Sequence, residues 1–140
     1  MTSGEKTEQI LLGIDFGETN IGLAFGRNNL VSPMKIVSGK NVDAAIADVT
    51  RVVLENKVTK VVVGLPVDYT GKETPASIRV RQFVNMLKVY VKVPIVFVSE
   101  YDSTKQSLNT AIEAGASRKR RRSVDDISAA VILKTYFDEG

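Results

Sequence analysis

The sequence predicts an α/β fold, with a mixed five-stranded sheet that carries helices on both faces. Short apolar runs of strand length, bounded by glycine, proline or polar residues, recur along the 140-residue chain. The first three runs are separated by short turns, which is typical of an antiparallel meander. The later runs are joined through helical segments, and such connections imply parallel pairing.

The meander occupies the first part of the chain. We expect its strands at residues 9–15 (QILLGID), 21–26 (IGLAFG) and 30–37 (LVSPMKIV). The sequence Arg27-Asn28-Asn29 between the last two strands favours a tight turn. The second and third strands should therefore form a hairpin.

Helices and strands alternate in the second part. Residues 41–57 predict a helix that Asn41 caps. Its apolar residues recur at helical spacing, at Val42, Ala45, Ile46, Val49 and Val53. Residues 60–66 (KVVVGLP) and 93–100 (VPIVFVSE) predict two more buried strands. Between them Thr74 and Pro75 are typical of an N-cap and a first-turn proline. They open a helix with an apolar stripe of Ile78, Phe83, Val84, Leu87 and Val91.

Two more helices complete the predicted fold. One covers about residues 103–114 and stops at Gly115. The last begins at about Val124, with Ser123 as its cap and Asp126 three residues further on. With no repeat and no linker in the sequence, we expect one domain over residues 1–140, in which residues 1–8 form a flexible tail.

Composition excludes several classes of protein. No run approaches the roughly 18 apolar residues of a membrane helix, and the first residues, MTSGEKTEQ, do not resemble a secretory signal. The chain has no cysteine, which excludes disulfides and is compatible with the cytoplasm. It also has no histidine, which excludes histidine bases and histidine zinc sites. Catalysis must then rest on carboxylates, lysines, hydroxyls or a metal held by oxygen.

Positive charge is concentrated in one run, Arg118, Lys119, Arg120, Arg121 and Arg122. Without these five residues the chain carries 14 basic and 16 acidic residues. The positive field is therefore local, which favours a docking place for an anion such as a nucleic-acid backbone. A merely solvated charged segment is the alternative.

Acidic residues stand where predicted strands end. Asp15 ends the first strand, Glu100 ends the last strand, and Asp125 opens the final helix. Reactive groups of open α/β sheets gather beyond the carboxyl ends of the strands. Three carboxylates there would repel one another unless a hard cation such as Mg²⁺ or Mn²⁺ lay between them. One or two such ions can support phosphodiester hydrolysis without a histidine.

Four segments of the chain resemble the YqgF/RuvX family over about residues 11–137, namely GIDFGETNIGLAF, VVVGLPVDYTGKETPASIRVRQFVNML, VSEYDSTKQS and SVDDISAAVILKTYF. Members are bacterial proteins with an RNase H-like fold. They are described as candidate Holliday-junction resolvases and as nucleases that mature the 5′ end of pre-16S rRNA. The resemblance implies an RNase H-like fold and a metal-dependent nuclease here.

The resemblance also implies roles for particular residues. It places the catalytic, metal-binding acids of the family on Asp15, Glu100 and Asp125. Helical spacing alone does not choose between Asp125 and Asp126. The chain departs from the family where Asn20 and Tyr101 stand in place of the usual arginines, so two expected phosphate-binding groups are missing.

Alternatives accompany these residues. Asp15 could accept hydrogen bonds within its own turn, Glu100 could be a surface acid, and Asp125 could favour the helix dipole alone. Lys72 and Arg79 are further candidate contacts for phosphate. Tyr69 and Tyr101 could stack on bases, although half-buried tyrosines at strand ends are commoner.

Alternatives also accompany the function. The nuclease could cleave an rRNA precursor or four-way DNA, and it could act as a homodimer on two-fold substrates. The chain could instead be a non-catalytic nucleic-acid-binding module. The segment DFGETN also resembles the phosphate loop of sugar-kinase, Hsp70 and actin ATPases, but those enzymes use two such domains.

Overall fold

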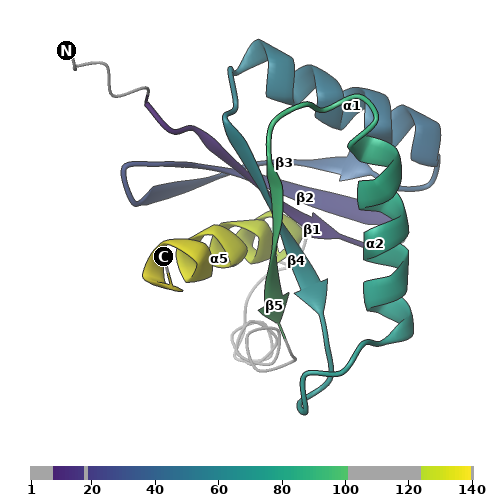
Figure 1. Ribbon diagram of the computed structural model, residues 1–140. Helices are drawn as coiled ribbons and strands as arrows, with labels where there is room; N and C mark the ends of the chain where they lie inside the picture. The colour runs from purple at the N-terminus through teal and green to yellow at the C-terminus, as the bar shows by residue number, and fades with distance from the viewer. Residues whose placement is uncertain (1–7, 18, 101–123, 140) are drawn as a thin grey trace.

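The computed structural model describes residues 8–17, 19–100 and 124–139, and of residues 124–127 it describes the backbone alone (Figure 1). Its elements in chain order are β1 (Leu11–Phe16), β2 (Asn20–Arg27), β3 (Leu30–Ser38), α1 (Val42–Glu55), β4 (Lys60–Pro66), α2 (Pro75–Leu87), β5 (Ile95–Glu100) and α5 (Val124–Glu139). The predicted order of strands and helices is confirmed over the described residues.

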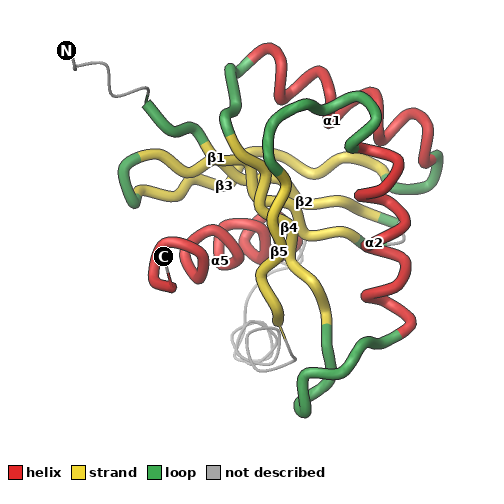
Figure 2. The backbone as a smooth tube through the Cα atoms, viewed as in Figure 1, coloured by secondary structure: helices red, strands yellow, loops and turns green. Residues whose placement is uncertain are grey.

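The sheet has the strand order β3-β2-β1-β4-β5. β1 pairs antiparallel with β2, and β2 pairs antiparallel with β3. β4 pairs parallel with β1 and β5 pairs parallel with β4. The predicted meander followed by parallel strands is therefore confirmed. In Figure 2 the strands form the central layer, with α1 and α2 on one side and α5 on the other.

The turn between β2 and β3 is tight because its two asparagines adopt left-handed backbone angles. Asn28 has φ 55° and Asn29 has φ 66°. Asparagine tolerates this region better than most side chains, and two such residues in a row match the twist of a hairpin. The register between these strands shifts at Leu23/Ala24, opposite Pro33. Proline is tolerated there because β3 is the last strand of the sheet on its side.

The larger core lies between the sheet and the helices α1 and α2. It contains Leu12, Ile14, Val61 and Val63 from the central strands, each with no exposed surface or almost none. The side chain of Asn41 accepts a hydrogen bond from the Ala44 N–H, so the predicted N-cap of α1 is confirmed. Thr74 caps α2 in a capping box with Ser77, and Pro75 follows at the first helical position.

The predicted apolar stripe of α2 needs two corrections. Ile78 is 51% exposed, although Val80 next along the core face is buried. Val91 is buried but lies beyond the helix, which ends at Leu87. Ile78 lies about 140° around the helix from Phe83, whereas Ser77, in the same turn, is fully buried. The core face consists of Ser77, Val80, Phe83, Val84 and Leu87, so the prediction placed Ile78 on the wrong face.

The smaller core lies beneath α5 on the opposite face of the sheet. Ala129, Ile132 and Leu133 are fully buried there against Leu11 and Val62. Several predicted features lie outside the described residues: the flexible tail at its residues 1–7, the helix at 103–114 with its stop at Gly115, and the Ser123 cap. Among the helices that the structure describes, none is long and apolar enough to cross a membrane.

Candidate functional site

Glycine lines the face of the sheet that α5 covers. A Cβ atom on Gly13 would lie 2.6 Å from Leu133 Cγ and 2.9 Å from the Ala129 carbonyl oxygen. A Cβ atom on Gly26 would lie 3.0 Å from the ring of Phe137. Real Cβ atoms essentially never approach other heavy atoms as closely as the first of these distances. The helix therefore lies where a side chain on the strand would otherwise stand.

These contacts fix the direction of α5. Phe137 lies over Gly26, which pairs with Leu11 at the beginning of β1. Ala129 lies over Gly13, further along β1. The helix therefore runs against β1, and its first turn points towards the carboxyl end of that strand.

Asp15 lies near that end of β1. It is half-buried and pairs with Gly22 of β2. Side chains alternate between the two faces of a strand, and Leu11 of the same strand belongs to the core beneath α5. Asp15 is therefore on the α5 face, in line with Leu11 and Gly13.

Glu100 ends β5 two strands away, and its carboxylate reaches back over β4. Its backbone pairs with Pro66. A Cβ atom on Gly64 would overlap Glu100 Oε2 and Ile132 Cδ1. The carboxylate thus occupies the space that a side chain at position 64 would fill, on the α5 face and beside the helix.

The register brings Gly64 next to Asp15. β1 and β4 are paired in parallel up to Ile14 and Val63, so Asp15 and Gly64 are the next residues on each strand. Neighbouring strands lie about 4.8 Å apart. The structure thus brings two of the three predicted acids, Asp15 and the Glu100 carboxylate, to the same face and the same end of the sheet.

Asp125, the third predicted acid, lies in the first turn of α5. It precedes Ala129 by one helical turn, in the row that continues through Leu133 and Phe137 over the glycines. The described part of the chain contains no group of three metal-ligating side chains, and the side chain of Asp125 lies outside it. Ala129, one turn after Asp125, is fully buried against Gly13, whereas Ala130, one turn after Asp126, is half-buried; this difference favours Asp125 over Asp126.

A loop held by hydrogen bonds joins this end of the sheet to α2. The Val67 N–H donates to the Glu100 carbonyl oxygen at 2.8 Å, and the Thr74 hydroxyl donates to the Pro66 carbonyl oxygen at 2.7 Å. Between them, Asp68 accepts hydrogen bonds from the Thr70 hydroxyl and from two backbone N–H groups, which lower the pKa of its carboxyl group. The loop that begins where β4 ends is therefore ordered by its own polar groups.

Lys72 and Arg79, the two further candidates for phosphate contact, extend from this loop and from the first turns of α2. Both are exposed. Asn20, one of the two positions where the family usually has arginine, is exposed at the start of β2. Tyr69 is 86% exposed rather than half-buried. Tyr101 and the basic run from Arg118 to Arg122 lie outside the described residues.

One cluster near the site was missed in the sequence. The Arg81 guanidinium forms two hydrogen bonds with Glu73, at 3.1 Å and 2.8 Å, and the Ser77 hydroxyl donates a third to the same carboxylate at 2.7 Å. These bonds lower the pKa of Glu73 to about 2, with the Arg81 bond as the largest cause. Glu73, Ser77 and Arg81 are four residues apart, a spacing that places side chains on one side of a helix and could have predicted this contact. The cluster ties Glu73, just before the N-cap Thr74, to the first two turns of α2.

The donor set at the sheet end suits a hard divalent cation. Asp15 and Glu100 supply carboxylate oxygens, which Mg²⁺ and Mn²⁺ prefer. Because Gly64 has no side chain, the Glu100 carboxylate can lie directly over β4. The residues present therefore fit the metal that the sequence predicts.

Comparison with known proteins agrees with this architecture. The family model of RuvX, described as a Holliday junction resolvase, matches residues 9–139. Similar proteins carry the name of a candidate pre-16S rRNA nuclease. The one from Mycoplasma mobile is 33% identical, covering 91% of this chain and 90% of its own, and the one from Synechococcus sp. is 36% identical over 91% and 77%.

Solved structures share the fold. RuvC of T. thermophilus, in complex with a Holliday junction substrate, matches with a TM-score of 0.52 at 18% identity, covering 65% of this chain and 64% of its own. The fowlpox virus Holliday junction resolvase matches with a TM-score of 0.51 at 15% identity, covering 94% and 98%. The mixed sheet with helices on both faces is thus the architecture of these resolvases.

We expect Gly64→Ala to weaken Mn²⁺ binding and to destabilise the protein, because the added methyl group overlaps both Glu100 and Ile132. Overpacking of this kind costs about 1–3 kcal/mol. Calorimetric titration with Mn²⁺ and urea unfolding measure the two effects.

Gly13→Ala is the matched control, because its methyl group would overlap α5 but not Glu100. It should destabilise the protein and leave Mn²⁺ affinity within about twofold per unit of folded protein. Equal losses of affinity in both variants would show that Gly64 acts on the helix alone.

We expect Arg81→Met to raise the pKa of Glu73 from about 2 towards its ordinary value of 4.5. A carboxyl group with a lowered pKa in the folded state stabilises the fold above pH 4.5, and this contribution is lost as the pH falls towards 2. The variant should lose that part of the pH dependence. NMR titration of the Glu73 carboxyl carbon measures the change, and an unchanged midpoint would contradict the assigned cause.

Proposed function

The chain belongs to the RuvX family, and we propose that it is a metal-dependent endonuclease that hydrolyses phosphodiester bonds in structured nucleic acid. Relatives that are 33% and 32% identical carry the name of pre-16S rRNA nucleases. The favoured substrate is therefore the 5′ end of the 16S rRNA precursor. The observation that carries the proposal is that Asp15 lies beside Gly64 on the neighbouring strand, while the Glu100 carboxylate lies over Gly64.

The acids would hold one or two Mg²⁺ or Mn²⁺ ions, with Asp15 and Glu100 as ligands and Asp125 approaching from the first turn of α5. When bound, a divalent ion stabilises negative charge on the phosphate and favours deprotonation of the attacking water. By holding such an ion, Asp15 and Glu100 would also fix the position of the scissile phosphate relative to the sheet end. The chain contains no histidine, so these carboxylates are the groups available to receive a proton from water.

Basic residues would hold the rest of the substrate. Lys72 and Arg79 flank the sheet end, and the run from Arg118 to Arg122 immediately precedes α5, whose first turn carries Asp125. Arginine binds phosphate through two parallel hydrogen bonds. Such contacts position the backbone without reading bases, which suits a substrate recognised by shape.

A second candidate is the cleavage of four-way DNA. The family model carries the description of a Holliday junction resolvase, and a homodimer with two sites would match a two-fold junction. The same acids would serve either substrate, because both reactions break a phosphodiester bond.

We expect Asp15→Asn to abolish Mn²⁺-dependent cleavage, with a loss of at least about 100-fold, since loss of a residue that only supports a ligand already costs 10–100-fold. The assay compares an rRNA precursor with four-way DNA. Asp126→Asn is the matched control and should retain activity. Nucleic-acid affinity should survive in both variants.

The outcomes separate the candidate functions. Cleavage of the precursor alone supports the rRNA nuclease, and cleavage of four-way DNA alone supports the resolvase. Binding without cleavage by the wild type would leave a non-catalytic module. Calorimetric binding of ATP would instead favour the relation to ATPases.

We expect the replacement of Arg118, Arg120, Arg121 and Arg122 by serine to reduce the dependence of nucleic-acid affinity on salt. Each lost phosphate contact lowers the slope of log K against log salt by about 0.7–0.9. Fluorescence anisotropy between about 50 and 200 mM salt measures it. An unchanged slope would mean that the run does not contact the backbone.

A further inference from the structure

The two edges of the sheet differ in how they are protected. β3, at one edge, contains Pro33, which has no backbone N–H, and its pairing with β2 shifts register at Leu23/Ala24. Proline and irregular register are features that keep edge strands from pairing with other chains. β5, at the other edge, has no proline and pairs with β4 in continuous register from Ile95 to Glu100. Within the described sheet no strand lies beyond it, so this edge is open to a further strand.

The backbone of β5 presents hydrogen-bonding groups on its outer side. The carbonyl oxygens of Pro94 and Glu100 accept hydrogen bonds from β4 and from the residue that follows it, at 2.9 Å and 2.8 Å. Successive residues of a strand point their backbone groups to opposite sides, so the even-numbered residues face β4. The N–H and C=O groups of Ile95, Phe97 and Ser99 therefore point away from the sheet.

A groove of about 450 Å³ runs beside this edge, between α2 and β5. The apolar part of its lining consists of Val84, Val93, Ile95 and Phe97. Phe97 is 36% exposed. Since side chains alternate between the two faces of a strand, a strand added beside β5 would place every second side chain in this groove.

The charge of the groove is positive. Lys88 lies on its α2 wall and is exposed, and it forms no ion pair with any other residue that the structure describes. Arg81 also lines the groove, but its guanidinium is bonded to Glu73. Among the described residues of the lining, none is acidic. An occupant that complements this groove carries a carboxylate for Lys88 and an apolar side chain for Phe97.

We propose that β5 binds an extended segment of another protein as a further strand of the sheet, with acidic and apolar side chains of that segment in the groove. The backbone of the segment forms hydrogen bonds with the outward groups of Ile95, Phe97 and Ser99. In this kind of recognition the main-chain bonds supply affinity and the alternate side chains supply selectivity. The proposal goes beyond the nuclease function, because none of these contacts uses the carboxylates of Asp15 or Glu100.

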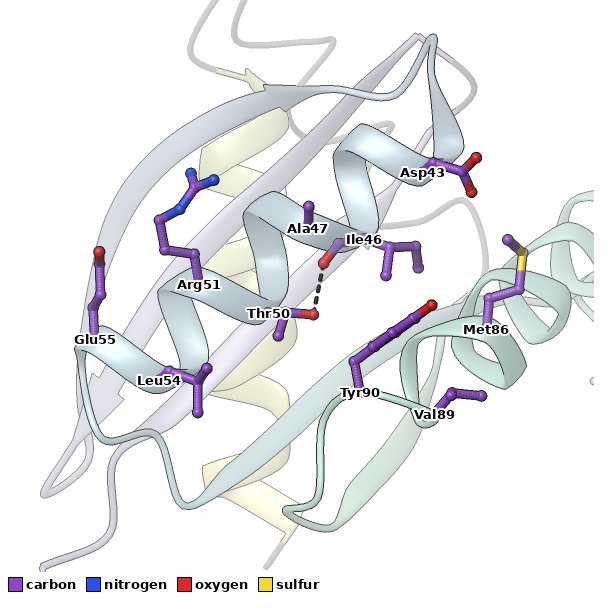
Figure 3. Close-up of a pocket in the computed structure, with 10 residues that line it drawn as sticks. All are labelled: Asp43, Ile46, Ala47, Thr50, Arg51, Leu54, Glu55, Met86, Val89 and Tyr90. Carbon is purple, nitrogen blue, oxygen red and sulfur yellow. Dashed lines mark hydrogen bonds between the residues drawn. The ribbon is translucent and has the colours of Figure 1, made fainter.

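A second groove lacks the feature that selects an extended chain. It lies between α1 and the end of α2, has a volume of about 960 Å³, and is drawn in Figure 3. Leu54 and Tyr90 on its walls are 71% and 62% exposed, so it offers apolar contact. Its α1 wall is helical, and the N–H and C=O groups within a helix bond to one another. The row of outward backbone groups on β5 has no counterpart on that wall.

A second copy of this chain fits the β5 edge less well than an acidic segment does. Side chains of an added β5 on the groove side would be Ile95, Phe97 and Ser99, and none of these is acidic. Such pairing would satisfy the backbone but leave Lys88 without a partner. A segment of another protein with a carboxylate at a groove-facing position satisfies both.

Amide hydrogen exchange of the full chain, followed by NMR, tests the proposal. The probe is a short acetylated peptide with glutamate, valine and glutamate at alternate positions and threonine between them, so either direction of pairing brings a carboxylate near Lys88. With the peptide at up to about 1 mM, the amides of Ile95, Phe97 and Ser99 should exchange at least about tenfold more slowly. The amides of the residues between them already bond to β4 and should change little.

Controls separate strand addition from other binding. A peptide with proline in place of the valine and one threonine should give no protection, because it lacks backbone donors for either direction of pairing. Lys88→Glu should weaken binding of the probe at least about threefold and favour a peptide with lysine in place of glutamate. Lys35→Glu, with the same charge change on β3, and Leu54→Glu, in the groove of Figure 3, should leave the affinity unchanged. Circular dichroism checks that each variant is folded.

Several results would overturn the proposal. One is slow exchange of the Ile95, Phe97 and Ser99 amides in the free chain at low concentration, since its own residues would then cover the edge. Protection that appears without peptide as the protein concentration rises would assign the edge to a second copy. Absence of protection at about 1 mM peptide, equal binding of the proline peptide, or loss of binding in Leu54→Glu would each show that β5 does not accept the strand.

Discussion

The close packing of α5 on the sheet is the constraint on which this structure depends. Gly13, Gly26 and Gly64 stand where the helix crosses three strands, and at two of them a methyl group would overlap the helix outright. Close approach buries Ile132 and Leu133 completely, and each such side chain contributes about 1.5–3 kcal/mol. The same approach sets the direction of α5, which brings the residues before Ala129 to the carboxyl end of β1. Packing and the placement of the acids thus have one cause.

Gly64 serves this packing and the site together. The space that it leaves is shared by the Ile132 side chain and the Glu100 carboxylate. A carboxylate that lies over a backbone, next to a buried isoleucine, has little freedom to move, and ligands held in this way need less ordering when an ion binds. The hydrogen bond from Val67 to the Glu100 carbonyl oxygen holds the same residue from its backbone.

Much of the fold could be predicted because its signals are local. Asn41 and Thr74 cap helices through bonds to residues three positions away, and the antiparallel and parallel pairings follow from the lengths of the connections. The exposure of Ile78 could have been predicted, because Ile78 lies five residues before Phe83, about 140° around the helix from the core face. The role of Gly64 requires knowing which helix covers which face. Asp15 and Glu100 were found from their places at strand ends, whereas Asp125 stays a proposal that rests on the course of α5.

Arg81 affects more than the entry of α2. Its guanidinium lies 5.1 Å from the centre of the Phe97 ring, and β5, which carries Phe97, is the last strand on its side of the described sheet. The edge strand of a sheet exposes unpaired backbone groups, and side chains that pack over it reduce its exposed apolar surface. Arg81 therefore covers part of the Phe97 ring on this edge strand while it also holds Glu73, so the cover of the strand and the geometry of the neighbouring loop depend on one side chain.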